Sequence, residues 1–559
     1  MKKHIKNMYW LLTIILLSVF CNKKTIPVLP SAPKQVAVKN IYINNAAFDN
    51  IIYGTNTQPL IKIEFTEPIL QSSIATAVKL TDAGGTETGI TTTLQNKDSV
   101  LLLQPAAPLN YLSKYNFKIS TSLKSASGGN FISYVNKDFI TKIDSSGKFP
   151  VISDNALLDL VQQQTFKYFW DFGHPVSGLA RERSNATPET VTSGGSGFGV
   201  MSIVAGINRN FITRAQGLAR MQTIVSFLKN TAQKFHGAFP HWLNGTTGVV
   251  IPFSQKDNGA DLVETSFLMM GLLTARQYFN AADTAETNLR NDINSLWNAV
   301  EWSWFRKNNE NVLYWHWSPN YNWEMNHQIR GWDECLITYV LAASSATYSV
   351  PLITYTNGWA GKGTNGFING NSYFDINLPL GPSFGGPLFF SHYSFLGINP
   401  NGLTDAYANY AMQTKNHTLI NYNYCVNNPL NRFGYSDSCW GLSASDIPNG
   451  YTASSPTNDV GVLTPTAALS SFPYTPTESM KALKFFYYVL GDKLWGEYGF
   501  KDAFSLQQPW FADSYLAIDQ GPIIVMIENY RSSLLWNLFT SCPEIKTGML
   551  SLGFSAPYL

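Results

Sequence analysis

Charged residues are scarce in this sequence of 559 residues. Asp, Glu, Lys and Arg make up only 14% of it, and 39 basic against 37 acidic side chains leave a formal net charge of +2. Nucleic-acid-binding proteins usually carry a basic surplus, and solvating tails usually carry acidic runs. The sequence has neither feature, so we expect no nucleic-acid partner.

Cysteine is also rare, with five residues. No cysteine or histidine spacing resembles a zinc site, and the eight histidines include no HExxH pair, so we expect no metal and no cofactor. In an exported protein Cys425 and Cys439 could form a disulfide that closes a loop. Cys335 and Cys542 lie in apolar helical contexts, which are typical of buried free thiols.

Motifs of several other enzyme classes are missing. There is no GxSxG nucleophile elbow. The glycine-rich run 192–199 precedes a predicted helix but lacks the Lys-Ser/Thr pair and the preceding strand of a phosphate-binding loop.

Aromatic residues, in contrast, are abundant: 15 Trp, 28 Tyr and 34 Phe. Such rings are usually core, but they also stack on the apolar faces of sugars, so the composition favours a carbohydrate ligand.

The N-terminus resembles an export signal. A basic start is followed by the apolar stretch 10–20, which is too short to span a membrane. Residues 17–21 resemble a lipoprotein cleavage box that ends at Cys21, although Phe20 replaces the small residue usual there. An ordinary cleaved signal (1–21) is the alternative. We expect lipidation of Cys21, attachment to the bacterial outer membrane through this anchor only, and a proline-containing tether over 22–34.

The chain is longer than a single core usually supports, so we expect two domains. Short alternating runs broken by glycine pairs predict an immunoglobulin-like (Ig-like) β-sandwich over 35–143. Helical patterns dominate residues 150–559 and predict an all-α toroid of paired helices; an α-solenoid is disfavoured because no fixed repeat is visible. The expected helices are 156–172, 198–207, 213–234, 261–279, 286–305, 329–345, 405–413, 461–471, 477–490 and 522–539.

One stretch, residues 255–279, joins acids to a helix that is apolar on all sides. Asp257, Asp261 and Glu264 have the spacing i, i+4 and i+7, which places them on one face near a helix start. The helix dipole favours negative charge there, and simple capping is the alternative role for each acid. Because the helix that follows is buried all round, we predict that the three carboxylates surround a water or a sugar.

An aromatic loop, residues 312–334, ends in Asp333 and Glu334. These two acids stand at the start of a second predicted helix. We expect Asp333 to cap the next helix and Glu334 to face a cleft. Two sets of carboxylates walled by aromatic loops fit glycoside cleavage, in which one acid protonates the leaving oxygen and another carboxylate activates water or attacks the sugar. A polysaccharide lyase with a Tyr or His base stays possible, because a fold does not fix a reaction.

The segments 166–184, 261–279, 314–345, 439–446, 495–504 and 519–536 resemble the glucoamylase-like family of bacterial glycoside hydrolases, which includes endo-β-1,2-glucanases. The resemblance implies an (α/α)6 barrel and an inverting hydrolase of glucans, with β-1,2 linkages as the leading substrate. A glucoamylase-type α-glucan hydrolase and an inactive glycan-binding surface lipoprotein remain alternatives. Endo action and exo release of a disaccharide both stay open, and the loop 355–395 is expected to decide between them.

The resemblance also implies roles for individual residues. Glu334 is expected to be the general acid, and Asp257, Asp261 and Glu264 the water-activating side, without a decision on which is the base. The expected substrate is a glucan oligosaccharide or polysaccharide, bound by a monomer. The expected sugar-binding residues are His316, Trp317, His327, Arg330, Trp332, Arg181, Trp440, Asp446 and Arg531.

Overall fold

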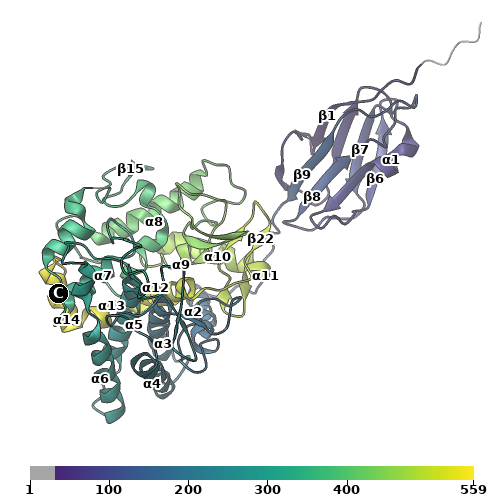
Figure 1. Cartoon of the computed structure of the whole chain (residues 1–559). Helices are drawn as coiled ribbons and strands as arrows, with labels where there is room; N and C mark the ends of the chain where they lie inside the picture. The colour runs from purple at the N-terminus through teal and green to yellow at the C-terminus, as the bar shows by residue number, and fades with distance from the viewer. Residues whose placement is uncertain (1–31, 365) are drawn as a thin grey trace, which may run out of the picture. The chain divides into compact units, whose positions relative to one another are not determined.

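The computed structural model describes residues 32–364 and 366–559, which divide into two compact units (Figure 1). The predicted signal, the lipidation site Cys21 and residues 22–31 of the tether lie outside the described residues. Within the part of the chain that the structure describes, no helix has the length and apolar character needed to cross a membrane.

The N-terminal unit is the predicted Ig-like β-sandwich. One sheet has the strand order β2-β1-β4-β7-β6 and the other β3-β9-β8-β5. Strand β4 shows why these residues form it: Ile61, Ile63 and Phe65 are buried, whereas the alternate Lys62 and Glu64 are half-buried. The strands are β1 (Val38–Ile43), β2 (Ala46–Ala47), β3 (Ile52–Thr55), β4 (Ile61–Phe65), β5 (Val78–Asp82), β6 (Ile90–Gln95), β7 (Val100–Pro105), β8 (Lys114–Ile119) and β9 (Val135–Thr141).

The second unit is mainly helical, as predicted, and short two- and three-stranded ladders tie its loops together. Its main helices are α2 (Asp154–Trp170), α3 (Ser193–Asn208), α4 (Arg214–Asn230), α5 (Leu262–Tyr278), α6 (Thr284–Ala299), α7 (Leu336–Ser344), α8 (Tyr410–Asn427), α9 (Pro465–Leu469), α10 (Pro476–Tyr488), α12 (Ala517–Ser532), α13 (Leu534–Thr540) and α14 (Pro543–Ser551).

Several helix boundaries differ from the sequence-based prediction: the predicted helix 522–539 is two helices, α12 and α13, and the predicted helix 461–471 is reduced to α9. Helix α3 begins at Ser193 and therefore contains the glycine-rich run. Helix α7 begins at Leu336, because residues 329–335 form a loop that holds Asp333 and Glu334 ahead of the helix. Helix α8 runs from Tyr410 to Asn427; its mixed polar and aromatic sequence has little periodicity, so the prediction of 405–413 missed most of it.

The glycines of α3 allow this helix to pack closely against α5. A Cβ on Gly197 would lie 2.1 Å from the carbonyl oxygen of Phe267, and a Cβ on Gly271 would lie 2.2 Å from that of Gly197. The backbones of the two helices therefore touch at this point, and both helices are buried along almost their whole length. Close packing of the two helices therefore explains why this run is rich in glycine, the feature that makes it resemble a phosphate-binding loop.

All four cysteines that the structure describes are free and buried. The disulfide considered between Cys425 and Cys439 is therefore absent, and both side chains instead pack with apolar neighbours in the core around α10. Burial raises the pKa of the Cys425 thiol to about 12, which makes it a poor thiolate nucleophile.

Candidate active site

The starts of four helices meet at one pocket of about 450 Å³. Thr192 precedes α3, Glu264 lies in the first turn of α5, Glu334 lies just before α7, and Ile518 lies in the first turn of α12; all four line the pocket. Helix N-termini carry partial positive charge and unpaired N–H groups, so they suit a pocket lined by acids. The aromatic lining consists of Trp242, Phe253, Phe267, Trp315, Phe389, Tyr393 and Tyr451.

Asp261 caps helix α5. Its Oδ1 accepts hydrogen bonds from the N–H groups of Val263 (3.0 Å) and Glu264 (2.9 Å), and its side chain is fully buried. Burial alone would raise its pKa, but the hydrogen bond between Oδ2 and His241 Nδ1 at 3.2 Å, the charges of the two histidines and the backbone N–H of Glu264 together outweigh burial and lower the pKa. Asp261 is therefore a charged residue that caps α5 and lies at the centre of the acidic group. Capping and membership of the acidic group, which were alternatives for this residue, occur together.

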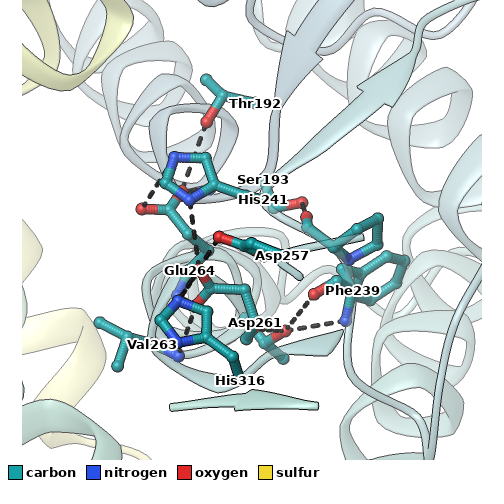
Figure 2. A network of polar contacts seen from close by, with 12 residues as sticks. Thr192, Ser193, Phe239, His241, Asp257, Asp261, Val263, Glu264 and His316 are labelled. Atoms are coloured by element: carbon teal, nitrogen blue, oxygen red, sulfur yellow. Dashed lines mark hydrogen bonds and ion pairs between the residues drawn. The ribbon is translucent and has the colours of Figure 1, made fainter. Parts of the chain in front are cut away.

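Glu264 is the member of the three predicted acids that lines the pocket. Its Oε2 accepts the N–H of Gly194 at 2.8 Å and the hydroxyl of Thr192 at 3.3 Å, so the start of α3 holds this carboxylate (Figure 2). Burial raises its pKa despite these donors and the ring of His241 at 4.0 Å from Oε1.

Asp257 lies in the loop ahead of α5 and is 5% exposed. Burial and the neighbouring Asp261 raise its pKa to about 7. The Nε2 atom of His316 lies 3.5 Å from Asp257 and 3.6 Å from Asp261, because strands β13 (Ala260–Asp261) and β14 (His316–Trp317) pair with Asp261 opposite His316. These contacts are longer than hydrogen bonds, and burial lowers the pKa of His316 to about 4, so its ring is neutral.

His241 joins the acids from the loop before strand β11 (Trp242–Asn244). Burial opposes its charge, but the carboxylates of Glu264, Asp261 and Asp257 raise its pKa to about 9. A protonated ring between Asp261 and Glu264 balances part of the negative charge, and Phe253 stacks on it with ring centroids 4.3 Å apart. Figure 2 shows the rings of His241 and His316 both turned toward the acids.

Glu334 carries the second acidic feature of the pocket. Burial and the adjacent Asp333 raise its pKa well above its usual range, which favours the protonated form. Asp333 accepts the backbone N–H of Cys335 at 2.8 Å and does not line the pocket; the N-cap of α7 is Cys335 rather than the predicted Asp333. A carboxyl that favours its protonated form, near a carboxylate such as Asp261 whose pKa is lowered, is the pairing that acid–base catalysis requires.

Two clusters of possible ligand atoms could hold a cation in the described part of the chain. One joins His241, Asp257 and Asp261, and the other joins Asp333, Glu334 and Cys335; in each, the ligand atoms lie within 4.8 Å of one another. In the first cluster, the hydrogen bond from His241 to Asp261 already balances charge without an ion.

Among the predicted sugar-binding residues, Asp446 lies behind the pocket wall and supports a residue that lines it. Its carboxylate accepts Arg183 Nη1 at 2.9 Å and the Ser514 hydroxyl at 2.5 Å. Arg183 lines the pocket, whereas the predicted Arg181 turns away: its guanidinium donates to the carbonyl groups of Pro188 and Phe172. The pocket arginine is thus two residues further along the chain than predicted.

Three other candidates lie outside the pocket lining, and two of them, Trp317 and His327, lie next to His316. Trp317 is half-buried and follows His316 in β14. His327 stacks on the pocket residue Trp315 at 4.9 Å between ring centroids. Arg330 is exposed and donates to Gln328 Oε1 and to the Asn357 carbonyl.

The structure does not support sugar contacts by Trp332, Trp440 or Arg531. Trp332 is 4% exposed and packs against Trp359, Phe395 and Tyr410 in the core. Trp440 is fully buried and donates its indole N–H to the Glu478 carbonyl. Arg531, at the far end of α12, pairs with Asp159 at 2.5 Å. A tryptophan or arginine near an acidic motif can lie in the core or at the surface, because the sequence does not show which face of a segment points toward the pocket.

Several residues that line or support the pocket are not among those predicted from the sequence. They include His241, Thr192, Gly194, Tyr393 and Tyr451. Thr192 and Gly194 belong to the glycine-rich run 192–199, whereas His241, Tyr393 and Tyr451 carry no local motif; the tertiary fold brings all five close to the acids.

A pocket at helix starts, lined by a glutamic acid with a raised pKa, a second buried carboxyl group and aromatic rings, has the groups that glycoside hydrolysis requires. Comparison with known proteins then identifies the family. A family model described as "Putative glucoamylase" matches residues 326–543, and one described as "Bacterial Ig-like domain" matches residues 36–141.

Solved structures match about three quarters of this chain. A protein titled a "putative glucoamylase" from Bacteroides uniformis is 57% identical, with a TM-score of 0.72, over 74% of this chain and 100% of that chain. An endo-β-1,2-glucanase from Chitinophaga pinensis, solved with sophorotriose and glucose, is 51% identical, with a TM-score of 0.71, over 73% of this chain and 100% of that one. The chain therefore belongs to the glucoamylase-like family, as the sequence motifs predicted.

A curated relative from Parabacteroides distasonis is named an exo β-1,2-glucooligosaccharide sophorohydrolase acting at the non-reducing end. It is 47% identical over 424 residues, which cover 72% of this chain. The match covers 58% of that relative, so this chain spans less than two thirds of its length.

Proposed function

We propose that this protein hydrolyses β-1,2-linked glucans with inversion at the anomeric carbon. The observation that carries the proposal is the presence, in one aromatic-lined pocket, of Glu334, whose pKa is raised by burial, and of Glu264, which the start of α3 holds by hydrogen bonds. The linkage follows from relatives at about half identity whose names state β-1,2-glucan substrates.

In the proposed reaction, Glu334 donates its proton to the glycosidic oxygen as the bond to the anomeric carbon breaks. Positive charge then develops on the sugar ring. The carboxylates of Asp261 and Glu264 favour that charge, and backbone N–H groups keep both in place before the substrate arrives. The aromatic rings of Trp315 and Trp242 offer flat surfaces for the sugar and exclude water from the reacting bond.

The arrangement of the helices supports an (α/α)6 toroid. Helices α3, α5, α7 and α12 all direct their N-terminal ends to the same pocket, as the inner helices of such a toroid do. In the proposed organisation, residues 35–143 form the Ig-like spacer and residues 150–559 the hydrolase domain. The protein acts as a monomer, and lipidation of Cys21 anchors it to the outer membrane.

Incubation with linear β-1,2-glucan, and separately with starch, tests the proposed reaction. We expect short β-1,2-oligosaccharides from the first and no product from the second. A disaccharide alone would indicate exo action, and a range of lengths endo action. Glucose from starch alone would refute the β-1,2 proposal in favour of α-glucan hydrolysis, and an unsaturated product absorbing in the ultraviolet would indicate a lyase.

The variant Glu334→Gln tests the general acid. It preserves the size of the side chain and removes the acidic proton, so we expect turnover to fall by about 10²–10⁴-fold. Turnover near that of the wild-type protein would refute the assignment. The anchor is tested separately: Cys21→Ser should move the exported protein from the membrane fraction to the soluble fraction.

A further inference from the structure

The loop that carries Glu334 is fixed at its start by the backbone of neighbouring segments. Ile329 donates its N–H to the Leu313 carbonyl at 2.9 Å. Gly331 donates its N–H to the Trp359 carbonyl, also at 2.9 Å. Glu334 stands two residues before α7, and its own backbone N–H donates a hydrogen bond to its carboxyl group. The position of the acidic group therefore depends on the position of the backbone at residue 334.

At the other end of this loop, helix α7 has no cap from its own N-cap residue. That residue is Cys335, whose side chain accepts no N–H group of the helix. The N–H groups of a first helical turn have no partner within the helix, and one that is buried without a partner lowers stability. Ile337 is a fully buried residue of this first turn, so its N–H needs a partner from another segment.

Ser394 supplies this partner. It is fully buried and lies in the short 3₁₀ helix η7 (Ser394–Leu396). Its Oγ accepts the N–H of Ile337 at 3.0 Å, and its hydroxyl donates to the backbone carbonyl of Glu334. One hydroxyl group therefore caps α7 from outside the helix and fixes the backbone that carries the general acid.

The segment around Ser394 is itself held by side chains from other parts of the helical unit. Its carbonyl groups accept three hydrogen bonds in which both residues are buried: from Tyr474 to Ser391 (2.8 Å), from Trp536 to Phe395 (2.7 Å) and from Asn529 to Leu396 (3.0 Å). Ser394 thus projects from backbone that is held in place on both sides of it. A hydroxyl on such backbone can in turn fix another segment.

The same segment also lines the pocket. Tyr393, which precedes Ser394, is part of the aromatic lining, as is Phe389 in the 3₁₀ helix η6 (Leu388–Ser391). In the proposed complex a sugar lies against these rings, whereas Glu334 is tied to Ser394. The distance between a bound sugar and the acid is therefore set through one short piece of chain, residues 389–394.

We propose that Ser394 is a positioning residue, which holds the backbone of Glu334 so that the carboxyl group reaches the glycosidic oxygen of a bound glucan. This inference rests on the proposed hydrolysis. Ser394 does not line the pocket, so it acts through Glu334 and not on the sugar. A misplacement of about 1 Å at an active site can lower a rate by about 10²-fold, so a hydroxyl that only fixes the backbone has a large effect.

A double-mutant cycle on the full chain tests the proposal. Ser394→Ala is made in the wild-type protein and in Glu334→Gln, and kcat on β-1,2-glucan is measured for all four proteins. In the wild-type background we expect Ser394→Ala to lower kcat by at least about fivefold with little change in KM. In the Glu334→Gln background we expect a further fall of less than about twofold, because no acidic proton remains to be positioned.

The cycle separates positioning from a loss of folded protein. A substitution that misfolds part of the protein removes the same fraction of active molecules in both backgrounds, so kcat would fall by the same factor in each. Equal factors would overturn the proposal. A fall of less than about fivefold in the wild-type background would also overturn it, because the position of the acid would then not depend on Ser394.

Ser391→Ala is the matched control. Ser391 is as buried as Ser394 and lies in the same segment, but its Oγ is hydrogen-bonded to Nδ1 of His417 at 2.8 Å and not to the loop of the acid. Each substitution removes one buried hydroxyl, so we expect similar falls in Tm, whereas kcat of Ser391→Ala should stay within about twofold of wild type. If both substitutions lower kcat equally, the effect belongs to the whole segment and the proposal is overturned.

Failure of this inference can be told from failure of the proposed function. If wild-type protein hydrolyses β-1,2-glucan and Glu334→Gln is slow, an unfavourable cycle refutes the role of Ser394 alone. If wild-type protein releases no product from β-1,2-glucan, the proposed function fails, and the positioning role fails with it.

Discussion

Replacement of His241 by Gln should destabilise the protein in a manner that depends strongly on pH. His241 is 25% exposed at its side chain and lies between Asp261 and Glu264. These carboxylates raise its pKa in the folded protein to about 9, whereas an unfolded histidine titrates near pH 6.5. Folding therefore favours the protonated ring, and its stabilisation is present in full below about pH 6.5 and is lost as the pH rises through 9.

The size of the effect follows from the difference between the two pKa values. About 2.5 units at 1.36 kcal/mol per unit give an upper limit of about 3 kcal/mol. We expect His241→Gln to lower the free energy of unfolding by up to this amount at pH 6 and by much less at pH 9.5. The loss at pH 6 is expected to be smaller than the limit if Asp257 or Glu264 takes up a proton in the variant.

Urea unfolding followed by tryptophan fluorescence is the suitable assay. No tryptophan lies between residues 35 and 143, so the signal comes from the helical unit and leaves out the Ig-like unit. A histidine with the opposite behaviour serves as the control: burial lowers the pKa of His417 to about 4, so the stability that it contributes is lost as the pH falls below about 6.5. His417→Gln should therefore cost more at pH 9.5 than at pH 6. Equal losses at both pH values for His241→Gln would refute the reasoning.

Three further predictions concern packing. Gly194→Ala should lower turnover by more than about tenfold, because its Cβ would lie 2.4 Å from Glu264 Oε2 and displace the carboxylate; Gly147→Ala, with its nearest neighbour at 3.9 Å, should have no effect on kcat. Trp332→Ala should lower the free energy of unfolding by about 3–5 kcal/mol, whereas Trp315→Ala should mainly raise KM; the reverse pattern in urea unfolding and kinetics would contradict their placement in core and pocket. Reducing agent should leave Tm unchanged, since Cys425 and Cys439 are free, and a fall in Tm would reveal a disulfide.

The sequence predicted both units and the acids of the site because these features are local. Alternation in residues such as 61–65 predicts strands, and the acids at 257, 261 and 264 ahead of an apolar helix predict a buried acidic helix start. Long motifs such as 261–279 and 314–345 were specific enough to identify the family.

The tertiary structure decided which side chains share the pocket. Residue 241 reaches Asp261 through a loop fixed by strand pairing. Arg183 lines the pocket, held by Asp446, whereas the carbonyl groups of Pro188 and Phe172 hold the guanidinium of Arg181 away from it. Burial likewise separated Trp332 and Trp440 from the pocket tryptophans, although all have similar sequence surroundings.

The sequence by itself thus determined the two folds, the family and the acids at two helix starts, because periodicity and motif length are properties of neighbouring residues. Only the tertiary structure decided the ionisation of those acids and the hydrogen bond from Ser394 to the backbone of Glu334. The physical reason is that a pKa depends on burial and on charges a few ångströms away, which here come from segments far apart in the chain.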